Sequence, residues 1–280
     1  MKIALRYLLS EYKRWLMQSK NITLLIGIVL VRKVVIVPLL DAAKSMNTPL
    51  QIWETSIAVG NSGLVLLLLP VFFIVLISDF PFLDSNLYFV LPRIGRKCWC
   101  VAQILFVYVS ALSYVVFIIF TTFIQTAFES YVFDGWSLVV TDYEDQFRIR
   151  TLIPLNLYNQ MSPVKAFLWT FLLLFLFTSL SASVILLGSS YGKKKLAVGA
   201  WIITIMLGMA TTSLKMTVQW IFPSSHAILW IHYDCYFRAV RFPVACSALI
   251  LLFLSILFNI LSYRKMKRID YSSLGEGVMI

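Results

Sequence analysis

The sequence predicts an all-α membrane protein with six transmembrane helices, an amino-terminal interfacial helix and re-entrant external helices before the last span. The first observation behind this prediction is composition, because 60% of the residues are hydrophobic and only 13% are charged, whereas about half of a soluble domain is apolar. The second is a series of apolar blocks close to the roughly 20 residues that a helix needs to cross a bilayer. The third is the placement of Lys and Arg at the ends of these blocks, as the positive-inside rule requires.

The amino-terminal segment, residues 1–20, is expected to form a helix that lies in the plane of the lipid headgroups. Lys2, Arg6, Lys13 and Arg14 are kept away from an apolar side of this helix, which is typical of interfacial helices. The apolar residues are Ile3, Leu5, Leu8, Leu9, Tyr12, Trp15 and Leu16. The alternative is a frayed basic tail.

The six apolar blocks predict the transmembrane spans. Pro70 lies near the middle of the second block and is expected to bend that helix, because proline removes a backbone donor. The fourth block ends in the small residues TSLSASV at 178–184, which allow helices to pack closely within or between subunits. The predicted spans are 21–40, 60–78, 101–125, 164–188, 196–214 and 243–263.

Four connections carry most of the polar residues. Residues 41–59 are expected to form a short mixed loop, and 126–162 a compact external cap rich in acidic residues and prolines. Residues 215–242 are too apolar for an ordinary loop, so we expect a re-entrant external segment whose backbone is covered by protein. Residues 78–100 form a short basic connector between two spans.

Arg32 and Lys33 interrupt the first apolar block. If the helix enters the membrane at Asn21, Arg32 lies near the midplane, where a cation requires water or a partner. Both residues would then line a conduit for a transported molecule. If the helix enters near Trp15, the pair lies close to the outer surface and can extend toward water. The sequence leaves both placements open.

The distribution of basic residues predicts the orientation. Fifteen Lys and Arg lie in the amino-terminal segment, the 78–100 connector, the 189–195 turn and the carboxy-terminal tail, against seven in the connections on the other side. We therefore expect both termini in the cytoplasm. The basic residues do not gather on a soluble face, so the net charge of +11 indicates anionic lipid rather than nucleic acid.

The chain offers few residues for catalysis. The nearest match to a nucleotide-binding loop, at Gly188 and Gly192, is one residue short between its glycines and lacks the Ser or Thr that would hold magnesium. His226 and His232 lie near Asp234 and Cys235 but do not share a helical face, so hydrogen bonding is expected there rather than a metal site. We expect no catalytic residue, no metal and no cofactor bound by this chain.

The acidic residues support the same conclusion. All thirteen fall in the predicted connections or termini, whereas a carrier driven by protons or sodium usually has a carboxylate within its spans. The sequence therefore argues against an ion bound at the midplane as the source of energy.

The layout resembles the transmembrane subunit of ABC-2-type exporters. That family has an interfacial amino-terminal helix, six spans with both termini inside, a cytoplasmic coupling helix between the second and third spans, and re-entrant helices before the sixth. The corresponding segments are 2–20, the six blocks, SDFPFLDSNLYFVLPRIGRKCW within 78–100, and WIFPSSHAILWIHYDCYF within 215–242. Within the family, a chain without a fused ATPase is similar to bacterial phenol-soluble-modulin-type peptide exporters and to lantibiotic-immunity permeases.

The resemblance implies a bacterial cell-membrane protein that works with a separate cytoplasmic ATP-binding subunit, which would bind the ATP and magnesium, and with a second permease copy. It implies export of an amphipathic or hydrophobic substrate such as a toxin or antimicrobial peptide. The alternatives are a lantibiotic or multidrug resistance permease and, more distantly, an ATP-independent carrier or a membrane-embedded enzyme. The candidate contacts for the ATP-binding subunit are Asp79, Asp84, Arg93, Arg96 and Lys97. The alternative for these charges is a solvated turn that obeys the positive-inside rule.

Overall fold

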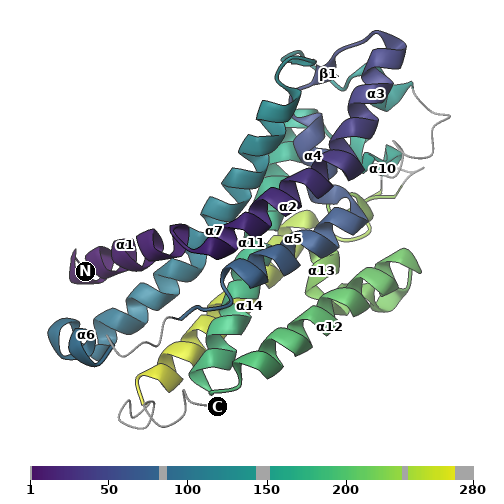
Figure 1. Cartoon of the computed structure of the whole chain (residues 1–280). Helices are drawn as coiled ribbons and strands as arrows, with labels where there is room; N and C mark the ends of the chain where they lie inside the picture. The colour runs from purple at the N-terminus through teal and green to yellow at the C-terminus, as the bar shows by residue number, and fades with distance from the viewer. Residues whose placement is uncertain (1, 82–86, 143–151, 235–238, 269–280) are drawn as a thin grey trace.

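The computed structural model describes residues 2–81, 87–142, 152–234 and 239–268, and these residues are almost entirely helical (Figure 1). Among these described residues, five helices are long and apolar enough to cross a membrane, and a bent pair of helices makes up to six. The described strands are β1 (Leu50–Gln51) and β2 (Ser130–Tyr131), which pair in parallel. The class predicted from the sequence, an all-α membrane protein, is confirmed.

The first candidate span, Ser19–Met46, is longer than the predicted 21–40. It contains η1 (Ser19–Asn21), α2 (Ile22–Val31), the π-helical turn η2 (Arg32–Ile36) and α3 (Val37–Met46). The wider turn precedes Pro38, which has no N–H and whose ring would clash with the carbonyl four residues earlier. The helix ends where Asn47 adopts a left-handed conformation with φ 50°, a common way to terminate a helix.

The second span is built differently from the predicted straight helix 60–78. Part of the expected 41–59 loop is α4 (Glu54–Asn61), all of whose residues are buried. It meets α5 (Gly63–Leu76) at an angle of 78°. The break is at Ser62, which is extended with ψ 123°, while α5 continues through Pro70. The backbone carbonyl of Asn61 accepts from Trp230 Nε1 at 3.2 Å, so a partner elsewhere in the chain replaces helical hydrogen bonding.

The remaining spans agree with the sequence within a few residues at most ends. α11 (Pro163–Ser190), α12 (Lys194–Ser213) and α14 (Val244–Met266) lie close to their predicted ranges. The third span, α7 (Arg96–Thr126), begins five residues before the predicted start at 101. Arg96 and Lys97 are therefore helical, and not part of a loop.

α11 is the central helix of the bundle. Its most apolar stretch is 72% buried, against 22% to 39% for the other four candidate spans. The small residues of 178–184 form part of its packing surface: Ser183 Oγ lies 2.9 Å from Ser255 Oγ of α14, and Trp201 Nε1 of α12 donates to Ser181 Oγ at 3.0 Å. The predicted packing face is confirmed, and it packs within the chain.

The helical elements in the described part of the segment before α14 are short turns, and the half-inserted position expected for 215–242 stays a prediction. These turns are η3 (Thr217–Ile221), α13 (Pro223–His226) and η4 (Trp230–His232). Phe222 is extended, with φ −92° and ψ 131°, because the residue before a proline disfavours the helical conformation. The prolines and short polar stretches therefore interrupt the helix that the apolar composition suggested.

The cap after α7 also contains only short elements among its described residues, α8 (Leu138–Thr141) and α10 (Leu155–Tyr158). It is joined to the rest of the chain by the β1–β2 pair, and a hydrogen bond from Trp136 Nε1 to Met161 O at 2.8 Å links two parts of the cap itself. The compact character expected for 126–162 holds for this described part of the segment.

Candidate functional site

Several basic segments gather at one end of the bundle, together with α1 (Lys2–Leu16), α6 (Leu87–Ile94) and the last turn of α14 (Figure 1). Lys194, at the α11–α12 turn, lies within electrostatic reach of Asp79 and Lys20. The Lys265 ammonium at the end of α14 lies 5.2 Å from the centre of the Tyr191 ring. The segments whose charge predicted a common side therefore do lie close together; we call this region the basic end.

α1 packs along α7 and divides its apolar residues between two neighbouring stripes. Ala4, Leu8 and Trp15 are buried, and Trp15 Nε1 donates to the Leu76 carbonyl at 3.0 Å. Leu5, Leu9 and Leu16 are exposed beside them, and then come the exposed Lys2, Arg6 and Lys13. A helix with one stripe on protein, one apolar stripe free and one basic stripe fits a membrane interface.

Asp79 holds the start of the connector against the start of the first span. Its Oδ1 lies 2.6 Å from Lys20 Nζ, which also donates to Ser78 Oγ at 2.6 Å. Both partners of the ion pair are partly exposed, so the pair contributes little stability by itself. Asp79 is thus engaged within the chain, and Asp84 lies outside the described residues.

The other predicted contact residues are exposed, Arg93 in the last turn of α6 and Arg96 and Lys97 in the first turn of α7. Leu91 and Ile94 of α6 pack against the core, while the Phe89 side chain is 70% exposed. Gly95 joins the two helices with φ 77°, a conformation that favours glycine. We call Phe89, Arg93, Arg96 and Lys97 the α6 surface.

The charges of the α6 surface are not placed to stabilise α7. Arg96 and Lys97 occupy its first turn, where the helix dipole disfavours cations by roughly 0.3–1 kcal/mol each. Positive charge at this end of the protein still agrees with the positive-inside rule. Two explanations for these exposed cations therefore remain: they orient the protein in the membrane, or they recognise an acidic or polar partner.

Glu54 is a buried carboxylate that the sequence prediction placed in a loop. It is 0% exposed in the first turn of α4, and it accepts hydrogen bonds from Ser137 N at 2.6 Å, Ser137 Oγ at 2.7 Å and Gln51 N at 3.1 Å. The expectation that every acidic residue lies in a connection is therefore wrong for Glu54. The two donors of Ser137 tie the bent second span to the cap after α7, and the sequence signal was a lone acid shortly before an apolar run.

His226 and His232 converge on one hydroxyl, although their spacing gave them no common helical face. Ser247 Oγ of α14 lies 2.7 Å from His226 Nδ1 and 2.7 Å from His232 Nε2. The other ring nitrogens face the carbonyls of Trp220 at 2.9 Å and Ile228 at 2.8 Å. The predicted hydrogen bonding of these histidines is confirmed.

A metal at this cluster lacks ligands among the described residues. Asp234 pairs with Arg241 at 2.8 Å, and Cys235 lies outside the described part of the chain. No group of three or more His, Cys, Asp or Glu side chains gathers anywhere in that part. The two histidines with Ser247 are therefore a hydrogen-bonded link between the turns and α14.

Arg32 and Lys33 lie halfway along the first span, and both are exposed on the outside of the bundle. The chain turns at Met17 and Gln18, and the long helix begins at Ser19. This start is close to the entry at Asn21 that would place the pair near the midplane. Both cations therefore face whatever surrounds the single chain, whether lipid, water or another subunit.

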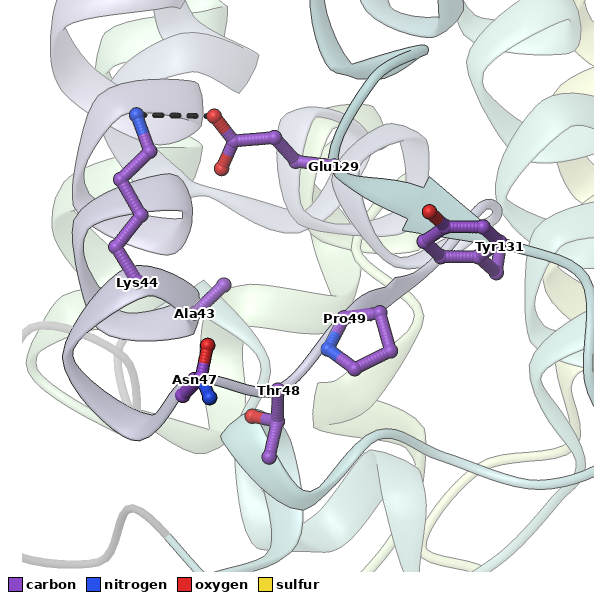
Figure 2. Close-up of a pocket in the computed structure, with 7 residues that line it drawn as sticks. All are labelled: Ala43, Lys44, Asn47, Thr48, Pro49, Glu129 and Tyr131. Carbon is purple, nitrogen blue, oxygen red and sulfur yellow. Dashed lines mark ion pairs between the residues drawn. The ribbon is translucent and has the colours of Figure 1, made fainter.

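A small open cavity lies at the opposite end of the bundle, beside β1 and β2 (Figure 2). Its volume is about 280 Å³, and Lys44 Nζ pairs with Glu129 Oε1 at 2.9 Å across it. Because the Lys44 side chain is 63% exposed, this pair is weak in water. The cavity offers a polar rim but no buried charged group to hold a ligand.

The fold and these clusters define a helical membrane protein that has several basic segments at one end and buried polar residues that link its spans. Comparison with protein families, with curated proteins and with solved structures finds no match for this chain.

Proposed function

We propose that the chain is the transmembrane subunit of an ATP-driven exporter and that a separate cytoplasmic ATP-binding subunit moves it. The observation that supports this most is the α6 surface. It combines the exposed Phe89 and Arg93 of the short helix α6 with the exposed Arg96 and Lys97 at the start of α7. Exposed aromatic and Arg side chains are typical of protein interfaces.

The proposed mechanism is mechanical. The ATP-binding subunit docks on the α6 surface, and α6 packs directly on α7. α7 in turn contacts both α1 and the central helix α11. ATP-driven closure of two such subunits moves two permease copies between inward-open and outward-open states, with α6 as the point where force enters.

Charge reversal of the α6 surface tests this assignment. The triple variant R93E/R96E/K97E is expected to lose the co-purifying ATP-binding subunit, because it replaces three cations with anions at the contact. The matched control K193E/K195E/K267E makes the same change in charge at exposed positions of the same basic end. Retention of a protein with a nucleotide-binding motif by the first variant, in a correctly inserted chain, would overturn the proposal.

The cargo we propose is an amphipathic or hydrophobic peptide, with a lantibiotic or multidrug substrate as the alternative. Arg32 and Lys33 would supply positive charge to a conduit formed with a second permease copy, since both face outward from the single chain. The double variant R32Q/K33Q should then reduce export while leaving insertion and ATPase binding unchanged. Unchanged export by this variant would remove the pair from the conduit.

A second candidate function is an ATP-independent carrier, favoured by one observation. Glu54 is a fully buried carboxylate in the first turn of α4, the first half of the bent second span, and buried carboxylates are the usual proton sites of carriers. Transport in purified vesicles without ATP, lost in a folded E54Q variant, would favour this function. Transport that requires ATP and the partner subunit favours the exporter.

A further inference from the structure

A cavity of about 540 Å³ opens between α1, α2 and α7 near the basic end. Its volume falls within the range of small-molecule sites, about 300–1,000 Å³. α1 supplies Tyr12, Trp15 and Leu16, α2 supplies leucines that include Leu25, and α7 supplies Ser113. Three segments distant in the sequence therefore form its wall.

The polar side chains of this wall are engaged with one another or with the backbone. Tyr12 Oη donates to Ser113 Oγ at 2.7 Å, and Ser113 Oγ donates to Val109 O at 2.8 Å. Trp15 Nε1 and Tyr114 Oη donate to the carbonyls of Leu76 at 3.0 Å and Leu69 at 2.8 Å. The wall therefore presents mainly hydrocarbon, and a polar ligand would lose its hydrogen bonds to water on entry.

The mouth of the cavity is also apolar. Leu16, Ile22 and Leu25 line it and are 51%, 63% and 62% exposed. Leu16 belongs to the exposed stripe of α1 that includes Leu5 and Leu9. In a membrane protein such a surface faces lipid, so the cavity opens toward the hydrocarbon of the leaflet in which α1 lies.

Positive charge lies next to this mouth. Lys13 is exposed one helical turn before Leu16, and Lys2 and Arg6 continue the same basic stripe of α1. A phosphate placed beside this stripe would gain about 1 kcal/mol per Lys or Arg near the membrane surface. The occupant that fits both the wall and the rim has an apolar chain and an anionic head.

We propose that the cavity binds one acyl chain of an anionic phospholipid whose headgroup lies beside Lys13. The lipid fills the space between α1, α2 and α7, so the position of α1 on the bundle depends on it. The site is independent of the proposed function, because it requires neither ATP nor a partner subunit.

The test uses the purified full-length chain in detergent and phosphatidylglycerol with a photoreactive group on its acyl tail. Illumination and peptide mapping should place most adducts on the α1, α2 and α7 residues of the cavity. The variant L25W narrows the mouth and should reduce this labelling roughly tenfold, the factor expected when about two methylene groups are no longer buried. The control L249W changes a leucine that is 63% exposed, against 62% for Leu25, and should leave the labelling unchanged.

Headgroup specificity is tested in the same experiment. Labelling by phosphatidylglycerol should fall severalfold in K13E, while labelling by the phosphatidylcholine analogue should be weak in both the wild-type protein and K13E. Adducts spread evenly over α12 and α14, or equal labelling by the two lipids, would overturn the proposal. Displacement of the lipid by a cationic amphipathic peptide, with the peptide crosslinked at the same residues, would also overturn it and assign the cavity to cargo.

Discussion

At the scale of single residues, the buried carboxyl group of Glu54 shows how hydrogen-bond donors within the described part of the chain hold a buried acid. Three hydrogen-bond donors surround it, and such donors offset part of the large penalty for removing a carboxylate from water. Removing an acceptor would leave the Ser137 and Gln51 donors unpaired and cost about 1–3 kcal/mol. Glu54 is therefore both a link between the bent span and the cap and the residue on which the carrier alternative depends.

The histidine cluster gives a prediction of pH dependence. Burial lowers the pKa of His232 to about 4, and it also lowers the pKa of His226. Because a His in the unfolded chain has a pKa of about 6.5, the unfolded state binds more protons than the folded state between these values. Stability is therefore fully present above about pH 6.5 and falls as the pH drops toward 4, by roughly 2–3 kcal/mol for His232.

Thermal unfolding in detergent at pH 7 and pH 4.5 measures this effect. The control H232N keeps a donor that can reach the Ile228 carbonyl but does not titrate, so its Tm should fall less than that of the wild-type chain. The Ser247 hydroxyl has one hydrogen to donate but lies beside one ring nitrogen of each histidine. Protonation of one histidine would supply the second hydrogen bond. If this added hydrogen bond stabilised the protonated histidine more than burial destabilises it, the wild-type Tm would fall no more between pH 7 and pH 4.5 than that of H232N. The prediction would then be wrong.

At the scale of elements, α12 depends on a close approach to the turns before α14. A Cβ added at Gly208 would clash with Ser224 Oγ and lie 2.7 Å from Phe222 Cβ, whereas one added at Gly199 of the same helix would meet nothing within 4 Å. G208A should lower stability by roughly 1–3 kcal/mol through overpacking. G199A should be neutral or stabilising by up to about 1 kcal/mol, because alanine favours helix. Thermal unfolding of both variants in detergent measures the difference. Equal Tm values would contradict the close packing of Gly208 against Phe222 and Ser224.

The helices also show which parts of the fold can be predicted from amino-acid composition. Four spans were predicted closely because long uncharged runs fix their ends, and the small residues of α11 correctly indicated its packing face. The bend at Ser62 was missed because its cause lies in partners distant in sequence, such as the Asn61 carbonyl that binds Trp230 Nε1. Pro70 was the local residue from which a bend was predicted, but α5 continues through it.

The candidate site was predictable to a similar degree. Charge placement selected Arg93, Arg96 and Lys97, which are exposed in the structure, but it could not show that Asp79 is engaged with Lys20. The cavity beneath α1 and the meeting of His226 and His232 at Ser247 have no local sequence signal. Each is formed by segments far apart in the chain, so helical periodicity along one segment could not indicate it.

At the scale of the whole molecule, the gathering of basic segments at one end predicts the orientation in the membrane. In a background without other cysteines, V132C at the opposite end should react with a membrane-impermeant thiol reagent in intact cells. K195C at the basic end should react only after the membrane is permeabilised. Labelling of K195C in intact cells would place the basic end outside and would contradict both the positive-inside assignment and the proposed docking of a cytoplasmic subunit.

The central claim is that an ATP-binding subunit docks on the α6 surface, and crosslinking from position 89 in native membranes tests it most directly. Phe89 is 70% exposed, so a photoreactive phenylalanine analogue can replace it without disturbing the core. The account predicts an adduct with a protein that carries a nucleotide-binding motif, lost in R93E/R96E/K97E. Adducts only with lipid, or with proteins that lack such a motif, would contradict it.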